Sequence, residues 1–112
     1  MATHGISRVS IFRIPRVEDQ EVVLEEFKKL KQCALKDGKP YILSVKAGRS
    51  LEDARNQDYS VVLQTTFDSL EDMQFFDNEC QFHVRVKKLV APRISPPPVV
   101  VFFKDVVSDS TA

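Results

Sequence analysis

The sequence is poor in the residues that build nucleotide and metal sites. Only three of its 112 residues are glycine, and they do not form the glycine-rich loop that cradles phosphate groups. Its two cysteines and two histidines do not have the number and spacing that a metal centre with three or four ligands requires. We therefore expect no metal and no nucleotide or other organic cofactor.

Long apolar runs and an excess of one charge are missing as well. The longest apolar run, VVVFF at 99–103, is far shorter than the ~20 residues that span a bilayer. Sixteen Lys and Arg balance sixteen Asp and Glu, so no net field draws the chain to nucleic acid or to an anionic membrane. The start, MATHGISRV, has no apolar core of a secretory signal, and two cysteines without a leader are expected to be reduced. These absences predict a cytoplasmic protein that binds neither nucleic acid nor membrane.

Four segments have the composition of β-strands. They are rich in β-branched and aromatic residues and end near turn-forming residues. We predict strands at residues 7–14, 40–48, 59–67 and 99–105.

A first helix is predicted between the first two strands. Its apolar stripe recurs at steps of four, three and four residues and consists of Val23, Phe27, Leu30 and Ala34. Acidic residues gather near the start of this helix and lysines toward its end, as the helix dipole favours. Gly38 and Pro40 supply the stop.

A second, continuous helix is predicted from residue 69 or 70 to about Val90. Ser69 and Asp72 have the spacing of a capping box, and prolines follow at 92 and 96–98. Spacings of three, four and three residues place four side chains on one face of this helix, directed toward the sheet: Met73, Phe76, Cys80 and His83.

The element order β-α-β-β-α-β predicts an α+β, ferredoxin-like fold, in which a four-stranded antiparallel sheet carries two helices on one face. We assign residues 5–104 to this single domain and 105–112 to a flexible C-terminal tail. If Tyr59, Val61 and Leu63 face the helices, Val62 is left on the bare face of the sheet. Val9 and Ile11 would join it there. Because bare apolar sheet usually marks an interface, we predict a homodimer whose sheets face each other.

The inward-facing His83 has two roles that remain open. It is either a satisfied structural histidine or a pocket residue that acts as an acid or base or binds a ligand. Cys80 and His83 supply only two metal ligands, so a metal site is rejected. A cysteine on an apolar helix face is more often an inert small hydrophobe than a nucleophile, so we do not expect a Cys–His catalytic pair.

Three stretches of the sequence carry a resemblance: YSVVLQTTFDSLED at 59–72, FFDNECQFH at 75–83 and DGKPYILSVKAG at 37–48. They resemble the stress-responsive A/B barrel family, also called Dabb or dimeric α/β barrel proteins, and the last stretch resembles the fungal branch most. The likeness extends over residues 5–104. It implies a homodimer with the two sheets facing each other as a barrel, and an apolar pocket between sheet and helices in each protomer.

The resemblance also implies a chemistry. Catalytic relatives carry out lyase or cyclase steps, including polyketide tailoring, without metal or organic cofactor, and they use a histidine of the second helix as the base. His83 stands at that position here. The relatives' helix hydroxyl is replaced by Phe76, and their third-strand and first-strand histidines are replaced by Val61 and Arg8. The alternative is a non-catalytic, stress-responsive dimeric binding protein.

We therefore predict a site for a small, largely apolar metabolite with His83 as the candidate base. Arg8, at the start of an inner strand, is either a rim residue or an anchor for a carboxylate, carbonyl or phenolate oxygen. The candidate ligand-binding residues are Arg8, Phe12, Phe27, Val61, Leu63, Met73 and Phe76.

Overall fold

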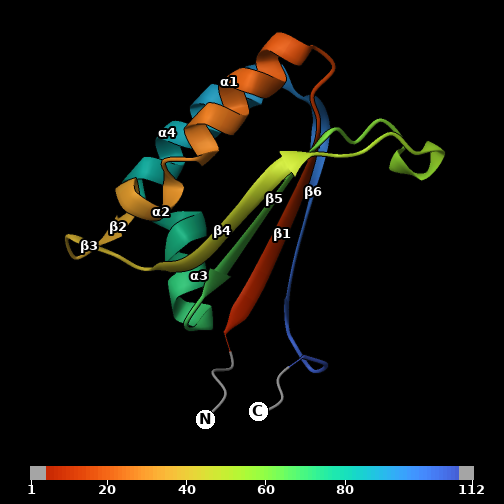
Figure 1. Cartoon of the computed structure of the whole chain (residues 1–112). Helices are drawn as coiled ribbons and strands as arrows, with labels where there is room; N and C mark the ends of the chain where they lie inside the picture. Colours follow the sequence, from red (N-terminus) through yellow and green to blue (C-terminus); the bar gives the residue numbers. More distant parts are fainter. Residues whose placement is uncertain (1–4, 109–112) are drawn as a thin grey trace.

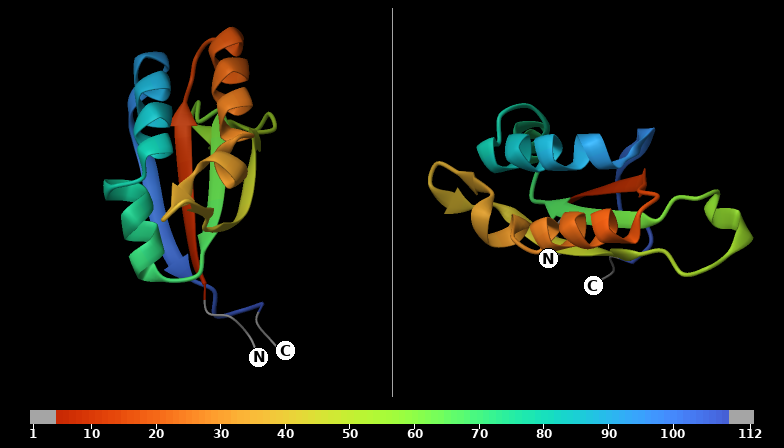
Figure 2. Two further views of the ribbon diagram at one scale, coloured as in Figure 1. Left: turned by 90° about the vertical axis from the view of Figure 1, so that its left-hand side faces the viewer. Right: turned by 90° about the horizontal axis from the view of Figure 1, so that it is seen from above.

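A twisted antiparallel sheet with helices on one face makes up the computed structural model, which describes residues 5–108 (Figure 1). The strand order is β4-β5-β1-β6, with β1 Ile6–Arg13, β4 Ile42–Arg49, β5 Val61–Phe67 and β6 Ser95–Lys104. The helices are α1 Val17–Phe27, α2 Leu30–Cys33, α3 Leu70–Asn78 and α4 Gln81–Val90. All four helices cover the same face of the sheet (Figure 2). The predicted ferredoxin-like α+β fold is confirmed.

The first predicted helix is divided into α1 and α2. The backbone N–H of Lys29 bonds the carbonyl of Glu26, three residues back, and this tighter turn redirects the chain between the two helices. The predicted stripe is nevertheless confirmed, because all four of its side chains are buried: Val23, Phe27, Leu30 and Ala34. A short hairpin of β2 (Leu35–Lys36) and β3 (Lys39–Pro40) follows, where the sequence predicted only a helix stop.

The second predicted helix is divided as well, and the expectation of one continuous helix is wrong. It starts as predicted, because the Ser69 hydroxyl accepts a hydrogen bond of 3.1 Å from the N–H of Asp72. Cys80 then has an extended backbone, and its N–H bonds the carbonyl of Phe75, five residues back. The carbonyl of Phe76, which a continuous helix would use for that bond, is left for another donor. The four side chains of the predicted inward face are all buried all the same.

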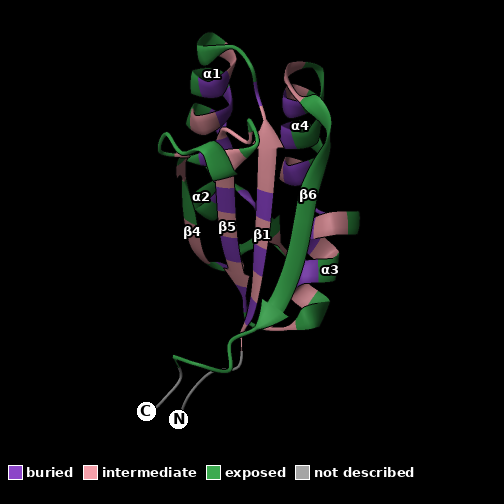
Figure 3. Cartoon of the chain, turned by 90° about the vertical axis from the view of Figure 1, so that its right-hand side faces the viewer, coloured by how far each residue is buried: buried purple, intermediate pink, exposed green. Residues whose placement is uncertain are grey.

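The two faces of the sheet differ in the way that the alternation of β5 predicts. Val61, Leu63, Thr65 and Phe67 are buried against the helices, whereas Val62 is only half-buried on the other face. Figure 3 shows this alternation along β1 and β5, and it shows β6 exposed over its whole length. The sequence did not predict that an apolar strand would be exposed at every residue.

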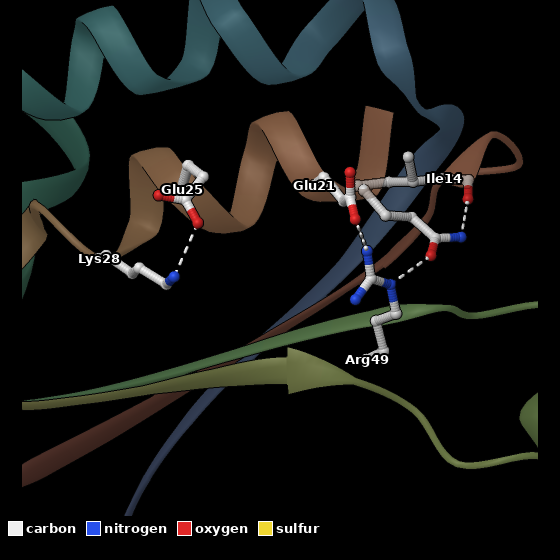
Figure 4. A network of polar contacts seen from close by, with 6 residues as sticks. Ile14, Glu21, Glu25, Lys28 and Arg49 are labelled. Carbon is white, nitrogen blue, oxygen red and sulfur yellow. Dashed lines mark hydrogen bonds and ion pairs between the residues drawn. The ribbon is translucent and has the colours of Figure 1, made fainter. Parts of the chain in front are cut away.

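Polar contacts fasten α1 to the end of the sheet. The Gln20 side chain donates to the carbonyl of Ile14 at 2.7 Å and accepts from Nε of Arg49 in β4 at 2.9 Å. The same guanidinium lies 3.7 Å from the carboxylate of Glu21 (Figure 4). These contacts attach the first half of α1 to β4 and to the end of β1. In residues 5–108 there is no helix long and apolar enough to cross a membrane.

Candidate functional site

An open-sided, mostly apolar cavity of about 270 Å³ lies between the sheet and the helices. β1, the edge strand β6 and α4 contribute most of its wall. Its volume is near the lower end of the range in which small-molecule sites are found. Five of the predicted site residues line it together: Arg8, Phe12, Phe27, Leu63 and His83.

Three predicted ligand-binding residues are buried but do not line this cavity. Val61, Met73 and Phe76 all belong to the core around it. Phe76 lies directly behind the wall, because its ring stacks on the His83 ring with a centroid distance of 3.7 Å and an interplanar angle of 11°. It therefore positions His83 rather than contacting the cavity itself.

Several lining residues were missed, and most of them had a signal in the sequence. Ser10 alternates with Arg8 and Phe12 along β1, which places it on the same face. Val86, Lys87 and Val90 follow His83 at helical spacing. The β6 residues Pro98 and Val100 had no local signal, because their place depends on the pairing of Ser10 with Val100.

His83 has a defined tautomer. Its Nδ1 lies 2.7 Å from the carbonyl oxygen of Phe76, the acceptor that the helix break leaves free. Because a carbonyl oxygen can only accept, Nδ1 carries the hydrogen and Nε2 of the neutral ring has a free lone pair. Nε2 has no hydrogen-bond partner within residues 5–108, so it can accept a proton from a molecule in the cavity.

Burial lowers the pKa of His83 from its ordinary value of 6.5 to about 4. The hydrogen bond to the Phe76 carbonyl acts in the opposite direction, while the positive charges of Arg8 and Lys87 lower the pKa further. The ring is therefore neutral at pH 7, which is the form that a general base needs.

Arg8 is a buried guanidinium and not a rim residue. Only 7% of the residue is exposed, and its Cζ lies 5.2 Å from the centre of the Phe76 ring. One terminal nitrogen donates to the Ser10 hydroxyl at 2.8 Å, and the other pairs with the Asp77 carboxylate at 2.8 Å. The third donor, Nε, is buried and has no partner among the described residues.

The charges on the cavity wall are of one sign. Arg8 and Lys87 line it, and none of the described lining residues is acidic. Asp77 neutralises Arg8 from outside the wall, and the Lys87 ammonium donates to the Asp77 carbonyl at 2.7 Å. Across residues 5–108, no three His, Cys, Asp or Glu side chains gather where they could hold a metal ion.

Comparisons with known proteins agree with this architecture. The family model described as the stress responsive A/B barrel domain matches residues 6–109. A fusaristatin A biosynthesis cluster protein of Gibberella zeae is 37% identical over 99 residues, which is 88% of this chain and 72% of that protein.

Two solved structures share the fold. The hydroxynitrile lyase of Passiflora edulis superposes with a TM-score of 0.77 at 16% identity, covering 96% of this chain and 99% of that one. A dimeric, ferredoxin-like protein of unknown function from Bacteroides fragilis superposes with a TM-score of 0.70 at 20% identity, covering 94% and 100%. These low identities show a common fold alone. The family model and the Gibberella relative show more, and the chain belongs to the stress responsive A/B barrel domain (Dabb) family.

Proposed function

We propose that the protein is a homodimer whose protomers each bind a small, largely apolar metabolite in the cavity. We further propose that His83 acts there as the base of a cofactor-free lyase or cyclase step. The observation that supports the proposal is the hydrogen bond between His83 Nδ1 and the Phe76 carbonyl, which leaves Nε2 unprotonated on a residue that lines a mostly apolar cavity. The protein would work in the cytoplasm and without a metal. Val61, Met73 and Phe76 would shape the site from behind its wall.

The low pKa of His83 limits the chemistry to acidic substrates. A base with a pKa of about 4 removes protons efficiently only from groups that are already acidified, such as the carbon between two carbonyl groups. Removal of that proton leaves an enolate, whose carbon can attack a second carbonyl in the same chain and close a ring. A positioned general base contributes about 10²–10⁴ in rate, which suffices for such a step. The Gibberella relative, a biosynthesis cluster protein, supports polyketide tailoring or a similar place in secondary metabolism.

The experiment uses 5-nitrobenzisoxazole, a flat apolar probe whose ring opens to a coloured phenolate when a base removes its carbon-bound proton. The wild type should accelerate this opening, and His83→Gln should lower the rate by about 10² or more. Glutamine keeps an N–H₂ group for the Phe76 carbonyl, so the fold should persist. The matched control is His4→Gln, the same change at the other histidine, which lies outside the described residues. A His83→Gln variant that opens the probe at the wild-type rate would remove His83 as the base.

The alternative function is a dimeric binding protein without chemistry. The hydrogen bond from His83 Nδ1 to the Phe76 carbonyl at the end of α3 favours this alternative, because it gives His83 a structural role that requires no substrate. Phe76 also provides no hydroxyl as a second acid–base group. In this case His83→Gln would lower stability modestly, and ligand binding would remain.

A further inference from the structure

The cavity has the shape of a groove that follows β1. Its lining residues on this strand occupy alternate positions: Arg8, Ser10 and Phe12. The lining residues of α4 extend from His83 to Val90, so the helix runs along the other side of the groove. β6 forms the outer wall and is not covered by a helix. Val100 is therefore 43% exposed, although its partner on β1, Ser10, is buried.

The two ends of the groove differ in chemistry. At one end Arg8 and His83 lie against the same aromatic ring, and Lys87 follows one helical turn after His83. The other end is closed by the polypeptide itself, because the chain passes there from α4 through η2 (Ala91–Arg93) into β6. Ile94 lines this closed end, and the described lining residues around it are all apolar. An occupant should therefore place its polar group at His83 and its apolar end at Ile94.

The length of the groove follows from the elements that form it. Between Arg8 and Phe12 the strand advances about 13 Å, at ~3.3 Å per residue. Between His83 and Val90 the helix advances about 10 Å, at ~1.5 Å per residue. An extended chain advances ~1.2 Å per bond, so a groove of this length holds about eight to eleven bonds.

The volume of the groove gives a second count. Its 270 Å³ hold about nine groups of the size of a water molecule, at ~30 Å³ each, and a methylene group is of similar size. The length and the volume therefore hold the same number of groups. This agreement requires that the groups lie in single file, with no room for a second chain or a wide ring system beside the first.

We propose that the groove selects one unbranched chain of about nine atoms, with its polar end beside His83 and its apolar end stopped by Ala91 and Ile94. This inference rests on the proposed binding of an apolar metabolite and specifies the shape and length of that metabolite. It makes Ala91 and Ile94 the residues that determine chain length. A chain bound in this direction presents the atoms at its polar end to His83, as the proposed proton transfer requires.

The test uses straight-chain carboxylates from hexanoate to dodecanoate, whose charge marks the polar end. Isothermal titration of the wild type at pH 8 should show an affinity that rises about threefold to fourfold with each methylene, up to about nine carbons. It should then level off, because further methylenes are left in water. Cyclooctanecarboxylate is the matched control for shape, since it has the nine carbons of nonanoate in a compact ring. It should bind at least about tenfold more weakly than nonanoate, because the ring is too wide.

Two substitutions at the closed end should move the length limit in opposite directions. Ala91→Phe fills part of the groove and should shorten the limit by about two carbons or more, whereas Ile94→Ala should lengthen it by about two. The matched control is Val84→Phe, because Val84 is 43% exposed on α4 and does not line the groove. Its limit should equal that of the wild type. Thermal melting checks the fold of each variant, and Ala91→Phe decides the matter if Ile94→Ala does not fold.

The possible outcomes separate this inference from the function on which it rests. An affinity that keeps rising to dodecanoate, or equal binding of nonanoate and cyclooctanecarboxylate, would overturn the single-file groove and leave apolar binding intact. A length limit that Ala91→Phe does not shorten would overturn the role of the closed end. Binding of none of these compounds would overturn both the groove and the proposed apolar site, whereas the ring opening of 5-nitrobenzisoxazole tests His83 separately.

Discussion

His83 divides two tasks between its two nitrogens. Nδ1 donates to the carbonyl of Phe76 and so satisfies a backbone acceptor at the end of α3. Nε2 remains a free acceptor at the cavity. The structural and the catalytic roles that the sequence left open are therefore compatible, because each uses a different atom. Loss of the ring affects both, which is why a variant at this position needs stability and rate measured side by side.

The low pKa of His83 predicts how stability depends on pH. In the unfolded chain His83 takes up a proton near pH 6.5, whereas in the folded chain it does so only near pH 4. Unfolding therefore binds a proton between these values, and the free energy of unfolding falls as the pH drops through this window. At 1.36 kcal/mol per pKa unit, His83 should remove roughly 2–3 kcal/mol between pH 7.5 and 4.5.

Urea unfolding of the wild type and of His83→Gln at both pH values measures this contribution. The glutamine variant should lose about 2–3 kcal/mol less than the wild type on acidification, because glutamine does not titrate. His4→Gln should behave as the wild type. Parallel losses in the wild type and in His83→Gln would show that the imidazole is not held neutral by burial.

The helix breaks show which part of an element its sequence determines. Spacings of three and four residues identify the buried face, and this part of the prediction is confirmed from Val23 to Ala34 and from Met73 to His83. Whether a helix continues without a break depends on which N–H group donates to each backbone carbonyl. The imidazole that occupies the Phe76 carbonyl comes from seven residues further on, and no local pattern reveals this bond.

The hairpin of β2 and β3 had a sequence signal, the dipeptide Asp37–Gly38, that the prediction did not use. Asp37 and Gly38, with φ of 53° and 78°, form its two-residue turn. Asp-Gly is a preferred pair for such turns, because both positions require positive φ. The sequence prediction used Gly38, together with Pro40, only as the stop of the helix. The far wall of the cavity was missed for another reason: Pro98 and Val100 reach it only through the register of β6 against β1.

Two glycines provide a matched test of this turn. A Cβ at Gly38 or at Gly48 would meet no atom within 4 Å, but only Gly38 has a positive φ, of 78°. Gly38→Ala should therefore lower the free energy of unfolding by about 1–2 kcal/mol, the cost of a left-handed residue with a side chain. Gly48→Ala should be neutral or slightly stabilising, because it restricts the unfolded chain. Denaturant melts of both variants measure the difference, and equal effects would contradict the assignment of strain to the backbone.

At the scale of the whole molecule, the exposed side of the sheet favours association with a partner. Val9 and Ile11 of β1 pair with Val101 and Val99 of β6, so these side chains form one apolar surface that also includes Val62. No described segment covers β6, whose apolar residues Val99 to Phe103 are 38–53% exposed. A contiguous apolar surface of this kind typically marks a protein interface. A second copy of this chain is the occupant that we propose.

A carboxylate on this surface should separate the protomers. Val101 is 53% exposed in the single chain, so Val101→Asp costs little in a monomer, but in a dimer it would bury an unpaired charge. The wild type should sediment as a dimer at micromolar concentration, and both Val101→Asp and Val62→Asp should raise the dimer dissociation constant by about 10² or more, since loss of at least ~3 kcal/mol is expected. Val84→Asp is the matched control, because Val84 is 43% exposed on α4, in the helix layer and away from the bare face. A wild type that sediments as a monomer, or a Val84→Asp variant that dissociates as readily as Val101→Asp, would show that this face of the sheet is not where two copies meet.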